Sequence, residues 1–308
     1  MKAAFFRRHG GPEVLEYGEL PDPVPAAGEI VVDIHATSIN AADWKMRAGK
    51  YGPNVVGFPH VPGRDFSGVV AALGEGASDF RVGELVYAVC EVPREGAYAE
   101  KIAIRQEIVT RKPEKLTHVQ TAAIALAGLT ALHSIEDTLK IQKGETILIQ
   151  GGAGGVAGFA IALAKHLGAH VITTASASNH DYVRSLGADE AIDYRSQDFT
   201  KVVKNVDAVF DTVGGDVTEK SFSVLRAGGR LASVAGGNSP APSPRSDVTS
   251  LRPKVTRDRP HLDRVASLAS QGIVPLPQIK EYPLSKAADA HRVSEARHLR
   301  GKLVLRVR

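Results

Sequence analysis

The sequence predicts an α/β protein in which a mostly β segment precedes a doubly wound parallel sheet. A glycine-rich loop near residue 151 lies between a strand pattern and a helix pattern, and strands and helices then alternate to about residue 234. The distribution of prolines also separates a first segment from this alternating region, because there are none between Pro113 and Pro240. Proline removes backbone donors from strands and breaks helices, so its absence suits alternating elements.

The glycine loop is the most informative stretch of the chain. The β-branched run 146–149 before it predicts a buried strand, and apolar residues at spacings of three and four after it predict a helix that ends at Gly168. Small residues at 152, 154 and 157 match the G-x-G-x-x-G/A pattern, which permits a tight turn and close approach to a pyrophosphate at a helix N-terminus. We therefore predict a dinucleotide site. Its expected loop contacts are Gly152, Ala153, Gly154, Gly155 and Val156.

The first segment reads as short strands separated by turn residues, which predicts a compact barrel or rolled sheet. The expected strands cover 30–34, 66–70, 85–89 and 101–104.

The middle segment continues the alternation after the glycine loop. Its expected strands are 170–174, 191–192, 208–211 and 230–234, with helices around 182–186 and 217–225. Ligands of such sheets bind at the carboxyl ends of the strands. The residues expected there are Ser176, Thr212, Val213, Ala235 and Gly236.

The last part of the chain returns to less regular patterns. Residues 236–244 predict a loop, either a surface connection or a lid. A helix around 262–268 and a final strand at 302–305 follow.

Composition narrows the class of protein. An apolar content of 43% and a charged content of 23% over 308 residues are typical of a soluble globular chain. A net charge of +4 does not indicate a nucleic-acid partner. No apolar run approaches the roughly 18 residues that a membrane span needs, and no signal-peptide core follows Met1, so we expect a cytoplasmic protein. Cys90 is the only cysteine, which excludes an internal disulfide and a cysteine-built zinc lobe.

Eight short motifs occur in one characteristic order along the chain. They lie at 38–43, 63–68, 96–100, 127–131, 151–157, 185–189, 211–215 and 301–305. With them the chain resembles the zinc-free medium-chain dehydrogenases/reductases of the quinone oxidoreductase branch, close to the NADPH-dependent enone reductases. The resemblance covers nearly the whole chain.

The resemblance implies two domains. A GroES-like substrate domain would occupy 1–122, a Rossmann domain 123–260, and the chain would return to the substrate domain over 261–308. One departure concerns the segment that faces the nicotinamide in this family, where Val255 lies within 253–256 in place of a more aromatic run.

The zinc branch of the same family holds its metal through a cysteine in the first motif and a His-Glu pair in the second. Here Asn40 and Arg64-Asp65 stand at those positions. Because zinc catalysis needs soft or anionic ligands that converge on one ion, we expect a metal-free enzyme.

Without a metal, the resemblance implies hydride transfer from NADPH to a quinone or an α,β-unsaturated carbonyl. Hydrogen-bond donors can stabilise the oxygen that becomes negative. The expected donors are Asn40 and Tyr51, for which a turn role and a pocket-wall role are the respective alternatives. Thr130 resembles the family threonine beside the nicotinamide, with helix N-capping as its alternative.

The end of the second strand of the dinucleotide domain predicts NADPH rather than NADH. NAD sites place a carboxylate there, whereas this chain has none before Asp181. Hydroxyl and amide groups can donate to a 2′-phosphate instead. The expected clasp is Ser176, Ser178 and Asn179, with Ala177 as a further cofactor-binding residue, and the family resemblance adds Tyr194. The alternative is a polar loop that only ends the strand.

Two other functions remain open from the sequence. One is an NADPH-binding protein with little turnover, acting as a redox sensor or cofactor sink; the other is an alcohol dehydrogenase, against which the missing zinc ligands argue. We also expect a homodimer or a dimer of dimers, joined at a sheet edge formed by the strand 230–234 and its C-terminal neighbours.

Overall fold

The computed structural model describes residues 1–51, 57–237 and 239–308, which form two compact units. Unit 1 comprises residues 1–126, 257–270 and 278–308, and unit 2 comprises residues 127–256 and 271–277. The division points lie near the expected boundaries at 122/123 and 260/261. The sequence predicts that all of 261–308 belongs to the first domain, and the structure differs at residues 271–277, which pack with unit 2.

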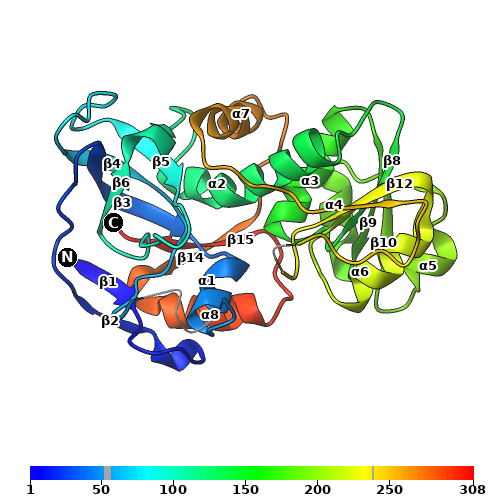
Figure 1. Cartoon of the computed structure of the whole chain (residues 1–308), viewed down its shortest axis with the longest axis horizontal. Helices are drawn as coiled ribbons and strands as arrows, with labels where there is room; N and C mark the ends of the chain where they lie inside the picture. Colours follow the sequence, from blue (N-terminus) through cyan, green and yellow to red (C-terminus); the bar gives the residue numbers. More distant parts are fainter. Residues whose placement is uncertain (52–56, 238) are drawn as a thin grey trace. The chain divides into compact units, whose positions relative to one another are not determined.

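Unit 1 is built on a mainly antiparallel sheet of seven strands, with β3 at its centre (Figure 1). One edge of β3 pairs with β6 and then with β15, and its other edge pairs with β4. The strands are β3 (Glu29–Ser38), β4 (Asp65–Leu73), β5 (Leu85–Val89), β6 (Lys101–Arg105), β7 (Val109–Arg111), β14 (Ile279–Pro283) and β15 (Lys302–Arg306); a separate pair is β1 (Lys2–Phe5) and β2 (Glu16–Glu19). This confirms the mostly β character expected of the first segment.

The core of unit 1 lies on one face of this sheet. Ile30, Val32 and Ile34 of β3 alternate inward and meet Phe66 of β4 without solvent exposure. Cys90 belongs to the same cluster at 1% exposure, so the only thiol is a buried apolar group.

Four helices complete unit 1 or begin in it, and only the third of them was expected from the sequence. They are α1 (Ala41–Arg47), α2 (His118–Leu132), α7 (Arg259–Ser270) and α8 (Ala287–Glu295). Helix α2 is apolar on nearly all faces and buried along most of its length, so it lacks the apolar stripe that identifies a surface helix. Within the described ranges, no helix is both long and apolar enough to span a bilayer.

Unit 2 contains a six-stranded sheet in which every pairing is parallel. The spatial order is β10-β9-β8-β11-β12-β13, the doubly wound order in which the first strand lies in the middle. The strands are β8 (Thr146–Gln150), β9 (His170–Ala175), β10 (Glu190–Asp193), β11 (Val206–Asp211), β12 (Leu225–Ser233) and β13 (Thr249–Leu251). The predicted parallel sheet is thus confirmed, and the edge strand β13 is an addition.

Helices lie around this sheet (Figure 1). They are α3 (Gly155–His166), α4 (His180–Ser185), α5 (Phe199–Val202) and α6 (Asp216–Ser221), and a π-helical turn, η3 (His133–Thr138), follows α2. Helix α3 ends where the sequence predicted, because Gly168 adopts a φ of +86° just after its C-cap. In the expected loop 236–244, residue 238 lies outside the described residues, and the rest has neither helix nor strand.

Candidate functional site

The glycine loop in unit 2 forms a turn that side chains would block. Gly151 has a φ of +79°, a conformation that favours glycine. A Cβ on Gly152 would lie 2.2 Å from the hydroxyl of Thr173 on β9, so no larger residue fits between the loop and the sheet. These two positions explain why the strand β8 can turn directly into α3.

The N-terminus of α3 is suited to an anion. Gly154 is its N-cap, in an extended conformation and without a side-chain cap, and a Cβ there would meet nothing closer than 3.5 Å. Backbone N–H groups at such a terminus carry partial positive charge. The loop therefore fits a dinucleotide pyrophosphate, with Ala153, Gly155 and Val156 on the same turn.

The other expected residues at the strand ends gather around this loop. A Cβ on Gly151 would lie 2.9 Å from the hydroxyl of Thr212 and 3.1 Å from Val213, so these residues cover the turn. The hydroxyl of Thr212 also donates to the carbonyl of Gln150 at 2.8 Å. Ala235 lies against Gly214, and Gly236 follows it with a φ of +87°.

Two other expected cofactor residues lie before and after these segments in the sequence. Thr130 is inside α2 rather than at its start, and its carbonyl accepts a hydrogen bond from Ser134 at 2.7 Å. The alternative role of N-cap is therefore wrong for Thr130. Val255 lies in the coil between β13 and α7.

The expected phosphate clasp follows β9. The amide of Asn179 donates to the hydroxyl of Ser176 at 3.0 Å, and the Ser176 and Ser178 hydroxyls are 3.3 Å apart. Asp193 of β10 pairs with Ala175 of β9. Tyr194 and Ser176 therefore directly follow the paired ends of two adjacent strands. Tyr194 is half exposed.

The sequence did not indicate that Asp193 would join this group. Its carboxylate accepts hydrogen bonds from Ser196 and the backbone of Arg195 and Ala177, and these bonds lower its pKa. An ionised carboxylate thus lies beside the clasp, and the charge of His180 lowers its pKa further. Parallel pairing of β9 with β10 brings these residues together, which spacing along the chain does not reveal.

In unit 1, Asn40 is held between a buried acid and a buried base. Its amide nitrogen donates to Asp65 Oδ2 at 3.0 Å, and its amide oxygen accepts from the ammonium of Lys302 at 2.7 Å. Asp65 also accepts from the backbone and hydroxyl of Ser38 at 2.9 and 2.8 Å. Burial raises the pKa of Asp65 and lowers that of Lys302, and the opposite charge of each partner counteracts its shift.

This arrangement bears on the expected role of Asn40. The amide is only 9% exposed and both of its ends are used, which favours a structural role and does not favour donation to a substrate. Asn40 also precedes α1, where the Asp43 carboxyl group accepts its backbone N–H at 2.8 Å.

Tyr51, the second expected donor, belongs to another group in unit 1. Its ring lies 5.4 Å from the guanidinium carbon of Arg64 and is 37% exposed. Arg64 donates through Nε to Glu95 at 2.5 Å, and His60 lies 3.5 Å from the same carboxylate. We call Tyr51, Arg64, Glu95 and His60 the Arg64 group.

A buried polar network anchors α1 to α8. Arg47 can only donate, so its contact of 3.1 Å fixes Nδ1 of His291 as an acceptor, which places the ring proton on Nε2, 3.1 Å from the Tyr98 hydroxyl. Tyr98 in turn donates to Asp43 at 2.9 Å. Burial, and then the charge of Glu95, raises the pKa of Asp43 to about 8, while burial lowers that of His291 to about 3.

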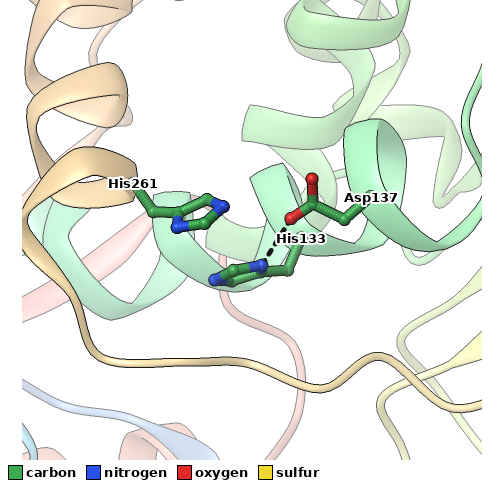
Figure 2. A group of neighbouring side chains, drawn as sticks. All are labelled: His133, Asp137 and His261. Atoms are coloured by element: carbon green, nitrogen blue, oxygen red, sulfur yellow. Dashed lines mark hydrogen bonds and ion pairs between the residues drawn. The ribbon is translucent and has the colours of Figure 1, made fainter.

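One histidine–carboxylate pair in unit 2 was not singled out from the sequence. His133 and Asp137 share a hydrogen bond of 2.6 Å at the i, i+4 spacing (Figure 2), and His133 also contacts the hydroxyl of Thr256 at 3.1 Å. The third labelled residue, His261, belongs to α7 of unit 1 and has its own partner, Asp258, at 2.6 Å.

Comparison with known proteins identifies the family. Residues 26–114 match the model of the alcohol dehydrogenase GroES-like domain, and residues 186–305 match that of the zinc-binding dehydrogenases. The chain is 32% identical to a chloroplastic NADPH-dependent alkenal/one oxidoreductase of Arabidopsis thaliana, covering 99% of this chain and 79% of that protein. It is 31% identical to a quinone oxidoreductase of Pseudomonas aeruginosa, covering 97% and 98%.

The chain belongs to the medium-chain dehydrogenases/reductases, in the quinone oxidoreductase branch. The structure of Escherichia coli quinone oxidoreductase complexed with NADPH covers all of both chains at a TM-score of 0.91 and 29% identity. The predicted combination of a GroES-like and a Rossmann domain is confirmed, and the protein is an oxidoreductase.

We predict that Asn40→Ala and Tyr51→Phe act differently. Asn40→Ala removes the hydrogen bonds that link Asp65 to Lys302, so the free energy of unfolding should fall by about 1–3 kcal/mol. Tyr51→Phe keeps the ring against Arg64 and removes only the hydroxyl, so stability should hold while kcat falls on the order of 10²-fold. Urea unfolding and steady-state kinetics of both variants provide the measurement. Full turnover in Tyr51→Phe together with a stable, slow Asn40→Ala would show that Asn40 is the donor.

Proposed function

We propose that this protein transfers hydride from NADPH to a quinone or an α,β-unsaturated carbonyl compound without a metal. The observation that carries the proposal is the open N-terminus of α3 behind a glycine turn, in a chain of this family. Relatives named as alkenal/one and quinone oxidoreductases reduce conjugated carbonyl compounds, which accept hydride at carbon and charge at oxygen.

In unit 2, the chain's own residues bind the two ends of the cofactor differently. Backbone N–H groups of the glycine loop would hold the pyrophosphate, and Ser176, Ser178 and Asn179 would donate to the 2′-phosphate. Bound NADPH supplies the hydride and becomes NADP⁺. The solved NADPH complex of a relative supports this choice of cofactor.

In unit 1, the acceptor's oxygen needs a donor as its charge develops. The hydroxyl of Tyr51 is the more accessible of the two expected donors, and Asn40 would act as a positioning residue at the start of α1. When hydride adds to the β-carbon, the C=C electron pair moves toward the carbonyl to form an enolate. A proton from water at the α-carbon then completes the saturated product.

The charges at the zinc-branch positions support a reaction without metal. A dication placed there would meet the guanidinium of Arg64 and the ammonium of Lys302, while the Asn40 amide and the Asp65 carboxylate are already bound within the protein. Like charges at close range oppose metal binding.

Turnover with a panel of quinones, short enals and cyclic enones tests the function. We expect NADPH oxidation that depends on the acceptor, with one saturated carbonyl or one hydroquinone formed per NADPH consumed. Tight NADPH binding without turnover of any acceptor would instead support the alternative of a redox sensor or cofactor sink.

We predict that NADPH is preferred over NADH and that Ser176→Asp reduces or reverses the preference. Two charge-assisted hydrogen bonds of about 1.5–3 kcal/mol each amount to roughly 10²–10⁴-fold in kcat/KM. An aspartate would repel the 2′-phosphate and could hold the ribose hydroxyls of NADH. The measurement is kcat/KM with NADPH and with NADH for each variant. Ser185→Asp, a substitution outside the clasp, is the control. Equal or better efficiency of the unaltered protein with NADH would refute the prediction.

A homodimer, or a tetramer built from dimers, is part of the proposal. Strand β13 is the last in the sheet order, so within the described ranges one of its sides has no strand neighbour. Such an edge can pair with its copy across a two-fold axis. Light scattering at micromolar concentration should give at least twice the mass of one chain, and the mass of a single chain would contradict this.

A further inference from the structure

Arg64 holds a buried donor that the described residues of unit 1 leave unused. The residue is 7% exposed, and its Nε pairs with Glu95. Its Nη2 is buried and, among the residues that the structure describes, has no hydrogen-bond partner. A buried donor on a permanent cation is costly when it is left unpaired. The Tyr51 ring offers only the weaker attraction of an aromatic face.

Charges of both signs surround Arg64. The side chain of Glu95 is fully buried. Among the residues that the structure describes, its carboxylate is the only one that forms an ion pair with Arg64. A second guanidinium, that of Arg257, is close enough that the charge of Arg64, after burial, lowers its pKa, while the charges of Glu91 and Glu95 act on it in the opposite direction. Asp43 adds little negative charge at neutral pH, since burial raises its pKa to about 8.

A guanidinium with an unused N–H in a partly desolvated setting is best matched by a carboxylate. Arginine keeps its charge at all relevant pH values, and its hydrogen bonds to carboxylates are stronger than those to neutral oxygens. A neutral ketone or quinone oxygen would also accept from this N–H, but its hydrogen bond would be weaker than that of a carboxylate. Because Arg64 lies beside Tyr51, an anion bound to Arg64 would lie near the residue proposed to donate to the acceptor's oxygen.

We propose that Arg64 binds a carboxylate of the acceptor, so that the preferred substrates are α,β-unsaturated carbonyl compounds that also carry a carboxylate group. This inference rests on the proposed function and narrows its substrate class. The carboxylate takes no part in electron transfer; it accepts a hydrogen bond from Nη2 and orients the conjugated double bond.

A matched pair of acceptors tests the inference directly. The probes are 4-oxopent-2-enoate and its methyl ester, which share the enone and differ in charge. With NADPH, we expect kcat/KM of the unaltered protein to be about 10- to 100-fold higher for the acid, as one charge-assisted hydrogen bond implies. Arg64→Gln should bring the acid-to-ester ratio close to one. Arg105→Gln, which removes an exposed arginine paired with Glu91, should leave the ratio unchanged.

Two further variants keep the test valid if Arg64→Gln fails to fold. Arg64→Gln/Glu95→Gln removes both buried charges together and should also abolish the ratio. Glu95→Gln alone retains the guanidinium without its carboxylate and should raise the ratio. The inference is overturned if the unaltered protein reduces the ester as efficiently as the acid. It is also overturned if the acid-to-ester ratio is unchanged in the double variant. Either result leaves the proposed function intact. If neither probe nor any quinone is reduced, the proposed function fails and the inference fails with it.

Discussion

The buried carboxylate of Asp65 is the constraint on which unit 1 depends most. It accepts hydrogen bonds from Ser38 on β3, from Asn40 before α1 and, at 3.3 Å, from the backbone of Leu126 on α2. Through the Asn40 amide it is joined to Lys302 at the start of β15. One anion thus ties together β3, β4, β15 and two helices, and a buried charge of this kind is tolerated only when its partners are all in place. The same network fixes where α1 begins.

Unit 2 depends on a different kind of constraint, which is the absence of side chains. The turn at Gly151 and the contact between Gly152 and Thr173 bring the loop against β9, and the unfilled space at Gly154 leaves the N-terminus of α3 accessible. The parallel order of the strands then aligns the ends of β8, β9, β10 and β11 beside this terminus. The fold therefore forms an anion site mainly from backbone groups, while side chains such as Ser176 and Asn179 determine selectivity.

The parts that could be predicted from the sequence are those governed by local pattern. Strand β5 was expected at 85–89 and is found there, and the loop–helix pattern placed the end of α3 correctly, because alternation and glycine chemistry act over a few residues. Helix α2 was missed because its apolar residues cover all faces, and β13 because three residues in a polar stretch carry no periodicity. The use of the Asn40 amide was also missed, since Lys302 is distant in sequence and its approach depends on the pairing of β15 with β3. The same holds for Asp193, which reaches the clasp through parallel pairing.

The central claim is that hydride transfer here relies on protein hydrogen bonds and charges where the zinc branch uses a metal. The most direct measurement is zinc content and NADPH-dependent enone reduction of the same preparation, before and after dialysis against a strong chelator. We predict no stoichiometric zinc at either stage and an unchanged rate. One tightly bound zinc per chain, with activity that is lost on its removal and restored on its return, would contradict the account.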